Sequence, residues 1–163
     1  MNDRRTNKQG SGELLRLGSV AALALFAGAM LTEGCILVPY WRSLPPAEFF
    51  AWYAANDERL FGFFAPLTVA AALMAITAAV LSFWRSEASR WTTGIAGVIL
   101  LAVVAMFPLY FERVNASFAA GSIGAQDLPA ELARWARWHW FRTGLSFLAL
   151  GAALIAARQG RVG

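Results

Sequence analysis

Residues 135–157 have the sequence WARWHWFRTGLSFLALGAALIAA, in which an aromatic and basic opening is followed by an apolar run. A helix that spans a membrane needs about 20 predominantly apolar residues, and this segment has that length and character. Its first turns hold His139, the only histidine of the chain, and Arg142, which the same helix would carry toward lipid. At positions i, i+4 and i+7, Trp135, His139 and Arg142 share one helix face. The segment therefore predicts a membrane helix with a polar and aromatic face near its start.

Three further apolar runs give the rest of the chain the same character. They cover residues 14–38, 60–84 and 91–111, and each is long enough to cross a membrane. Only 15% of the 163 residues are charged, against about 25% in an average soluble domain, so the chain has too few charges to cover a water-facing surface. Because short connections favour antiparallel neighbours, we predict an all-α integral membrane protein built as an up-down antiparallel four-helix bundle.

The net charge of +4 does not indicate a nucleic-acid partner, because the basic residues gather at the ends of the apolar runs. The segments on the N-terminal side of the predicted membrane carry more of them than the opposite loops, which by the positive-inside rule places both termini in the cytoplasm. These residues are Arg4, Arg5, Lys8, Arg16, Arg85, Arg90, Arg158 and Arg161. We expect a multi-pass protein of a bacterial inner (plasma) membrane. Cys35 is the only cysteine, which excludes an intrachain disulfide.

Composition divides the chain into three parts. The polar segment 1–12 is expected to be a disordered cytoplasmic tail, and 159–163 is expected to be a second cytoplasmic tail. The four-helix transmembrane domain lies between them at residues 13–158. Its predicted spans are about residues 14–38, 60–84, 91–111 and 138–157.

Prolines and polar residues predict where the helices begin, bend and end. Pro39 should end the first helix, because it has no N–H to continue the hydrogen-bond ladder, and Pro108 should bend the third. Residues 43–48 resemble a helix start and predict a short interfacial helix in the first outer loop, before the second span. A second helix start at Asp127 predicts one unbroken helix from there to Ala157.

Polar residues from all four helices should fall at the same end of this bundle, with residues 57–59 as the contribution of the second helix. Ionisable groups inside a membrane bundle cost roughly 2.5–3.5 kcal/mol each and usually face the interior with a partner. Their convergence at one depth therefore predicts a site, and the opposite end has no comparable set in the sequence. The catalytic candidates are His139, Arg142, Glu33 and Asn115, and the substrate-binding candidates are Trp135 and Glu112.

Each candidate also has a structural interpretation. Glu33 and Arg142 would pair to hold two helices together, His139 would be a satisfied buried group, and the tryptophans near it would form an interfacial belt. A single histidine excludes a multi-histidine metal site within this chain. A mixed metal or haem site from Glu33, Glu112 and His139 stays open, although no spacing pattern supports it.

Three features of the sequence resemble a known family. They are Trp135-x-x-x-His139-x-x-Arg142 at the start of the last helix, the loop Leu44-Pro-Pro-Ala-Glu-Phe49, and Asn115 at the end of the third helix. Together they resemble the anthrone oxygenase-like family of small four-helix membrane proteins, over most of the chain from residue 14 to residue 157. One departure is that the family often has a proline close before the asparagine, whereas Pro108 lies seven residues before Asn115.

The resemblance implies oxidation of an anthrone-like aromatic compound by dioxygen without a metal or flavin cofactor. His139 would remove a proton from an acidic carbon, Arg142 and Asn115 would stabilise the oxyanion, Glu33 would orient the histidine or arginine, and Trp135 would stack on the substrate. The expected partners are membrane lipid and a hydrophobic aromatic small molecule, with no nucleic acid. The alternative is a non-enzymatic bundle that binds a lipid, a quinone or a membrane partner and uses the polar cluster as a buried ion-pair network. The sequence leaves the oligomeric state open.

Overall fold

The computed structural model describes residues 3–162, with side chains described for residues 12–160, and over this range it contains helices and turns but no strand. Four helical segments at Gly12–Ser43, Pro46–Trp84, Arg90–Ala119 and Leu128–Gly160 are long and apolar enough to cross a membrane. The predicted all-α four-helix fold is therefore confirmed.

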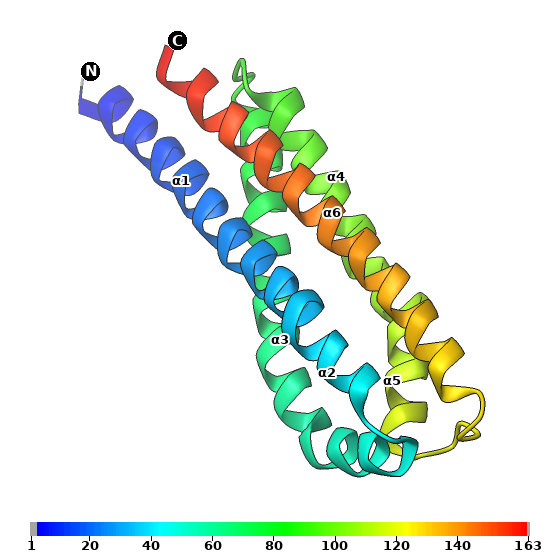
Figure 1. Ribbon diagram of the computed structural model, residues 1–163. Helices are drawn as coiled ribbons and strands as arrows, with labels where there is room; N and C mark the ends of the chain where they lie inside the picture. Colours follow the sequence, from blue (N-terminus) through cyan, green and yellow to red (C-terminus); the bar gives the residue numbers. More distant parts are fainter. Residues whose placement is uncertain (1–2, 163) are drawn as a thin grey trace.

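The four segments pack as an antiparallel bundle with both chain ends at the same end of the molecule (Figure 1). The first segment joins α1 (Asp3–Thr32), a π-helical turn η1 (Glu33–Leu37) and α2 (Val38–Ser43). The second is α3 (Pro46–Trp84), and the third joins α4 (Arg90–Met106), a second π-helical turn η2 (Phe107–Phe111) and α5 (Glu112–Ala119). The fourth is α6 (Leu128–Val162). In cross-section α1 and α4 lie diagonally opposite, and each contacts both α3 and α6.

Small residues let these helices approach closely in the half of the bundle nearer the termini. Ala71 and Ala75 of α3 are buried against Leu23 of α1 and Leu100 of α4. At Gly97 an added Cβ would lie 3.4 Å from the Cβ of Ala79, so α3 and α4 already touch at van der Waals distance. Such close approach of small residues is how membrane helices associate, since apolar burial supplies no drive between helices in lipid.

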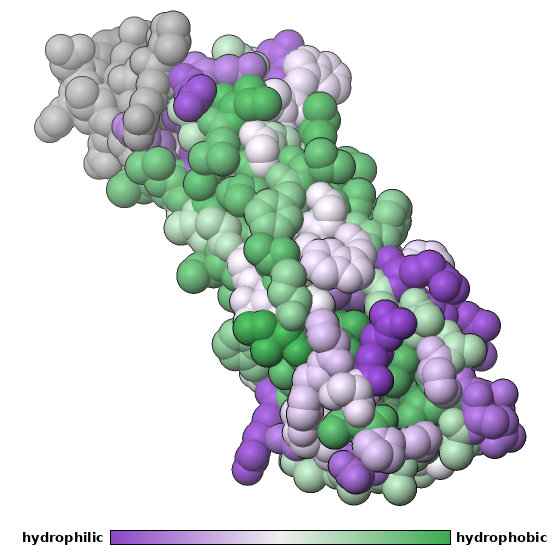
Figure 2. All heavy atoms as spheres, in the orientation of Figure 1, coloured by the Kyte–Doolittle hydropathy of each residue, from purple (hydrophilic) through white to green (hydrophobic). Residues whose placement is uncertain are grey.

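The outside of the bundle is apolar in its middle, as Figure 2 shows for one face. Leu25, Val98, Leu109 and Leu148 are each more than three-fifths exposed, and Leu109 reaches 82%. Large exposed aliphatic surface of this kind is typical of a protein that contacts lipid rather than water. The helices and this surface together make the chain an integral membrane protein.

The first helix does not end at Pro39, which corrects the sequence prediction. The first helical segment continues through η1 into α2 and ends at Ser43, and Pro39 lies in the first turn of α2. A proline in a regular helix clashes with the carbonyl four residues before it, and the wider π-turn relieves this clash. The third helix solves the same problem in the same way. Pro108 lies within η2, so the irregularity expected there is a π-turn and the helix runs on to Ala119.

The short interfacial helix and the second span form one element, which also corrects the prediction. The helix begins at Pro46, close to the predicted start, and runs without interruption to Trp84. No proline or glycine lies between residues 47 and 61 to end it. In Figure 1 the first turns of α3 lie across the lower end of the bundle before the helix turns upward.

The other boundaries follow the sequence more closely. α6 runs unbroken from Leu128 to Val162, as predicted from the helix start at Asp127. α1 already begins at Asp3, within the segment 1–12 for which composition predicts a disordered tail. Residues 1, 2 and 163 of the two predicted tails lie outside the described residues.

Candidate functional site

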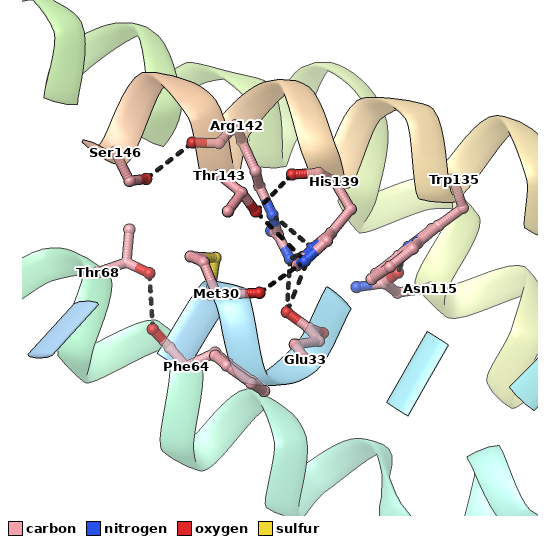
Figure 3. A network of polar contacts seen from close by, with 10 residues as sticks. All are labelled: Met30, Glu33, Phe64, Thr68, Asn115, Trp135, His139, Arg142, Thr143 and Ser146. Carbon is pink, nitrogen blue, oxygen red and sulfur yellow. Dashed lines mark hydrogen bonds and ion pairs between the residues drawn. The ribbon is translucent and has the colours of Figure 1, made fainter. Parts of the chain in front are cut away.

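A buried polar cluster lies between η1 and α6 (Figure 3). The Nη2 atom of Arg142 donates to Oε2 of Glu33 at 2.9 Å, and Nδ1 of His139 lies 3.4 Å from the same oxygen. The His139 side chain is fully buried, Glu33 is almost so, and 14% of the Arg142 side chain is exposed. The structure therefore brings together three of the four residues that the sequence marked as catalytic candidates.

The two π-turns position the surroundings of Arg142. Glu33 is the first residue of η1 and pairs with the guanidinium. Phe111 is the last residue of η2, and its ring centroid lies 4.1 Å from Cζ of Arg142, a close cation–π contact. Each π-turn thus delivers one side chain to the same arginine from opposite sides of the bundle. Phe111 was not among the sequence candidates. A π-turn changes which residues face the interior, and the only sequence signals of the two π-turns are Pro39, just after η1, and Pro108, within η2.

The hydrogen-bond partners of His139 assign its tautomer. Nε2 lies 2.9 Å from the backbone carbonyl oxygen of Met30, and a carbonyl only accepts, so Nε2 carries the proton. Nδ1 is then the acceptor and receives the N–H of Arg142 Nε at 3.3 Å, with Nη2 at 3.0 Å. Thr143 lies beside the ring and donates its hydroxyl to the carbonyl of His139 itself at 2.8 Å. The basic lone pair of the imidazole therefore faces Arg142 and Glu33.

Trp135 and Asn115 hold the other side of the imidazole. The indole and the His139 ring are nearly parallel, with 6° between their planes and 5.1 Å between centroids. Nε1 of Trp135 donates to Oδ1 of Asn115 at 2.9 Å, which ties α6 to α5. Trp135 is only 1% exposed and also packs edge-on against Trp41. The indole thus stacks on His139, not on an open space where the sequence interpretation placed a substrate, and Asn115 contacts the indole.

Glu112 does not join the cluster. It is exposed on the surface of α5, and within residues 12–160 no ion pair or hydrogen bond links it to Glu33, His139 or Arg142. Over the same residues no three histidine, cysteine, aspartate or glutamate side chains lie close enough to share a metal ion. The mixed donor set of Glu33, Glu112 and His139 is therefore not assembled.

The charged residues 57–59 of the second helix stay outside the cluster, which corrects the expectation that they are the contribution of this helix. Glu58 and Arg59 of α3 are exposed, and Oδ1 of Asp57 accepts the backbone N–H of Glu58 at 2.7 Å. These residues follow one another in a regular helix, where only every third or fourth position faces the interior. The second helical segment instead places Tyr53, which is 3% exposed, near enough to interact electrostatically with Glu33 and Arg142.

The two tryptophans next to His139 lie on the surface of the bundle. Trp138 and Trp140 are 41% and 44% exposed, and Trp138 stacks on Tyr110 with 5.4 Å between ring centroids. Of the three tryptophans in residues 135–140, only Trp135 faces His139 in a stacked arrangement. The helical spacing of Trp135, His139 and Arg142 therefore predicted their common face correctly.

A second polar cluster lies at the opposite end of the bundle, which corrects the expectation of none there. Nη1 of Arg16 on α1 contacts Oε2 of Glu87 at 2.6 Å, in the turn between α3 and α4. The hydroxyls of Ser82 and Ser89 also donate to Glu87, at 3.1 and 3.4 Å. This cluster connects α1 to the turn and contains no histidine, so it has the character of a structural anchor.

A family comparison agrees with this geometry. A family model described as "Anthrone oxygenase" matches residues 49–152. The chain belongs to the anthrone oxygenase family. The matched region holds Asn115, Trp135, His139 and Arg142, whereas Glu33 precedes it. Searches of curated proteins and of solved structures gave no match.

The cluster of this anthrone oxygenase family member joins a base, a cation and a carboxylate in a dry environment. In such surroundings hydrogen bonds and charge interactions are stronger than in water. Within the described residues Nη1 of Arg142 has no hydrogen-bond partner. The Arg142 side chain is also the most exposed of the three, at 14%. The imidazole can accept a proton on Nδ1 once the guanidinium that covers this nitrogen moves away, and Nη1 can donate to an oxyanion.

Proposed function

We propose that this anthrone oxygenase family member is a membrane-embedded oxygenase that uses dioxygen to convert an acidic benzylic CH₂ of an aromatic or polyketide-type substrate into a ketone. The observation that carries the proposal is the buried pair of His139 and Arg142, with the unprotonated Nδ1 held 3.0 Å from Nη2 of the guanidinium. A neutral imidazole suits proton abstraction near neutral pH, and a fixed guanidinium suits a developing oxyanion.

The reaction balances with dioxygen as the only oxidant. The CH₂ group loses one proton to His139, and the electron pair left on its carbon is delocalised as an enolate onto the carbonyl conjugated with it through the aromatic ring. The carbanion transfers one electron to O₂, and the resulting radical and superoxide combine into a peroxide anion. That anion takes the proton back from His139. His139 then removes the second benzylic proton as the O–O bond breaks, and the departing hydroxide takes that proton, so one CH₂ and one O₂ yield one C=O and one water.

The other residues of the cluster have supporting roles in this scheme. Because Nδ1 of His139 is covered by Arg142 in the resting structure, the guanidinium must move from the imidazole onto the substrate oxygen when substrate binds. Glu33 holds that guanidinium at 2.9 Å and keeps it ionised. Trp135 fixes the plane of the imidazole, and Asn115 holds Trp135. The carbonyl oxygen of Asn115 therefore positions Trp135. The amide NH₂ of the same side chain can still donate to an oxyanion.

Oxygen uptake by the purified protein tests the proposal. Anthrone is supplied to protein in detergent, and the consumption of O₂ and the formation of anthraquinone are followed together, with the autoxidation rate without protein subtracted. The wild type is expected to consume one O₂ for each quinone, and His139→Gln to lose about 100-fold or more in rate, as removal of a general base does. Trp138→Phe, on the outward face one residue away, serves as the control. Unchanged turnover in His139→Gln would remove His139 from the mechanism.

A second candidate function is a non-enzymatic bundle that binds a lipid, a quinone or a membrane partner. It is favoured by one observation: Glu33 and both ring nitrogens of His139 have partners inside the chain, as in a purely structural network. The two functions differ in what they require of the charged pair. A structural pair can be replaced by apolar side chains without loss of function, whereas a catalytic pair cannot.

A further inference from the structure

An open groove of about 890 Å³ lies on the surface between the end of the first helical segment and α6. Gly34, Val38 and Arg42 line one wall, and Ala136, Arg137 and Trp140 line the other. The volume is in the range of small-molecule sites. The Figure 2 view shows apolar and hydrophilic side chains side by side on the face where α2 and α6 lie in Figure 1.

The groove reaches the buried cluster at Gly34. A Cβ added to Gly34 would lie 3.0 Å from Nε2 of His139 and 3.0 Å from the ring of Trp140. Gly34 therefore lies in the groove wall and next to the Nε2 edge of the imidazole. Trp140 stands beside it, 44% exposed, while His139 is fully buried. A rotation of the Trp140 side chain would widen the gap between η1 and α6 next to His139.

Two arginines without acidic partners face each other across this groove. Arg42 lies on the α2 wall and Arg137 on the α6 wall, and both are exposed. Arg134, one turn before Arg137, pairs with Glu131 at 3.1 Å, but within residues 12–160 neither Arg42 nor Arg137 has an ion pair. No aspartate or glutamate lines the groove. A guanidinium on each wall, above a floor of small residues, complements a flat apolar molecule with an anionic substituent.

We propose that this groove is the port through which a flat aromatic anion enters, with Arg42 and Arg137 binding its carboxylate or phenolate and Trp140 acting as the gate to His139. The proposal rests on the proposed oxygenase function and narrows its substrate class to aromatic compounds that carry an acidic substituent. The small residues of the floor, Gly34, Ala133 and Ala136, leave room for a ring system against the helix backbone. Gly34 lies beside Nε2 of His139, whereas the basic Nδ1 is the other ring nitrogen and lies beside Arg142.

Cys35 makes the port testable without following any reaction. It is the only cysteine of the chain, it is exposed, and it lines the groove. The full-length protein is placed in phosphatidylcholine nanodiscs, and the rate at which N-ethylmaleimide modifies Cys35 is measured with increasing anthracene-2-carboxylate. The carboxylate is expected to slow modification about tenfold at saturation, and the neutral analogue 2-hydroxymethylanthracene to protect only at about tenfold higher concentration, since a charge-assisted contact is lost.

Matched double variants distinguish binding by the two groove arginines from a nonspecific effect of the net positive charge. Arg42→Gln with Arg137→Gln should raise the half-protecting concentration of the carboxylate about tenfold or more and leave that of the neutral analogue unchanged. Arg59→Gln with Arg113→Gln removes the same charge from exposed sites outside the groove and should change neither. Equal weakening in both double variants, or equal protection by both compounds, would overturn the proposal.

An anionic lipid headgroup is the competing occupant of the groove, and a third experiment tests whether it binds there. Protein in phosphatidylglycerol nanodiscs is modified without any added aromatic compound. Arginine-dependent protection by this lipid alone, together with no protection by the carboxylate in phosphatidylcholine, would assign the groove to a lipid headgroup and overturn the proposal. Because the readout is Cys35 modification, failure here leaves the oxygen-uptake test of the proposed function intact, and failure of oxygen uptake leaves this result intact.

Discussion

Glu33 and Arg142 are joined at 2.9 Å although 109 positions separate them in the sequence, and their contact links the first and the last membrane helix. The two side chains are 5% and 14% exposed, so the pair is formed away from bulk solvent. It persists there because the guanidinium also contacts His139 and the face of Phe111. Such a pair constrains helix packing whether or not it is catalytic, so tests must separate stability from activity.

Removal of one partner of this pair should destabilise the protein strongly. Glu33→Leu leaves the Arg142 guanidinium buried without its carboxylate, at a cost of about 3–5 kcal/mol. Glu33→Leu combined with Arg142→Met should recover most of that loss, because apolar replacement of a whole buried pair is often tolerated. The unfolding midpoint in detergent measures both effects.

The same double variant distinguishes the two candidate functions. For an oxygenase that uses Arg142 to stabilise an oxyanion, oxygen uptake should stay at the background rate although the fold is restored. Full activity in the stable double variant would support the non-enzymatic interpretation of the cluster and contradict the role given to Arg142.

The bond between Trp135 and Asn115 should respond as a coupled unit. Asn115→Ala removes the acceptor from a buried indole N–H, which costs about 1–3 kcal/mol for the unsatisfied donor. Trp135→Phe removes that donor, so Asn115→Ala in the Trp135→Phe background should cost clearly less. A double-mutant cycle on unfolding free energy measures this coupling, and strictly additive effects would show that the hydrogen bond contributes nothing.

The second polar cluster should matter for stability alone. Glu87→Gln weakens the contact to Arg16 and the bonds from Ser82 and Ser89, with an expected loss of about 1–3 kcal/mol. Oxygen uptake measured below the unfolding midpoint should equal that of the wild type, because this cluster lies at the other end of the bundle. A fall in uptake at unchanged stability would mean that this end also takes part in function.

The part of the site on α6 was predictable because α6 is regular. In an unbroken helix residues at i, i+4 and i+7 share a face, and Trp135, His139 and Arg142 do so here. The same helical geometry explains why Glu112 lies outside the site. The buried face here is formed by Phe111 of η2 with Val114 and Phe118 of α5, and Glu112 is rotated about 100° from Phe111, toward the surface.

The helix ends were less predictable, because a proline can either end a helix or lie at a π-turn through which the helix continues. A rule that stops helices at proline is correct for chains in water, where a helix end can be solvated. In a membrane an early end would expose backbone groups to lipid, so the chain widens into a π-turn and continues at Pro39 and Pro108. The sequence shows the proline but not this choice. Hence η1, η2 and the contact between Phe111 and Arg142 emerge only from the structure.

Gly34 should be the glycine most sensitive to a single methyl group. Gly34→Ala places a Cβ 3.0 Å from Nε2 of His139 and 3.0 Å from the Trp140 ring, so one of the two must shift. Displacement of His139 would lengthen its 2.9 Å bond to Met30 and disturb the tautomer that keeps Nδ1 basic. We expect oxygen uptake to fall about tenfold or more, as misplacement of a catalytic group by a fraction of an ångström to about 1 Å does.

Gly28→Ala is the matched control on the same helix. Beyond the backbone of its own helix and its two chain neighbours, no atom lies within 4 Å of the Cβ that it would add, so the extra methyl group meets open space. Alanine should stabilise the helix there by up to about 1 kcal/mol, and oxygen uptake should not change. Equal activity of Gly34→Ala and Gly28→Ala would mean that the close approach of η1 to His139 is not required for catalysis. Loss in Gly34→Ala alone, with a wild-type unfolding midpoint, would locate the effect at the imidazole and its gate.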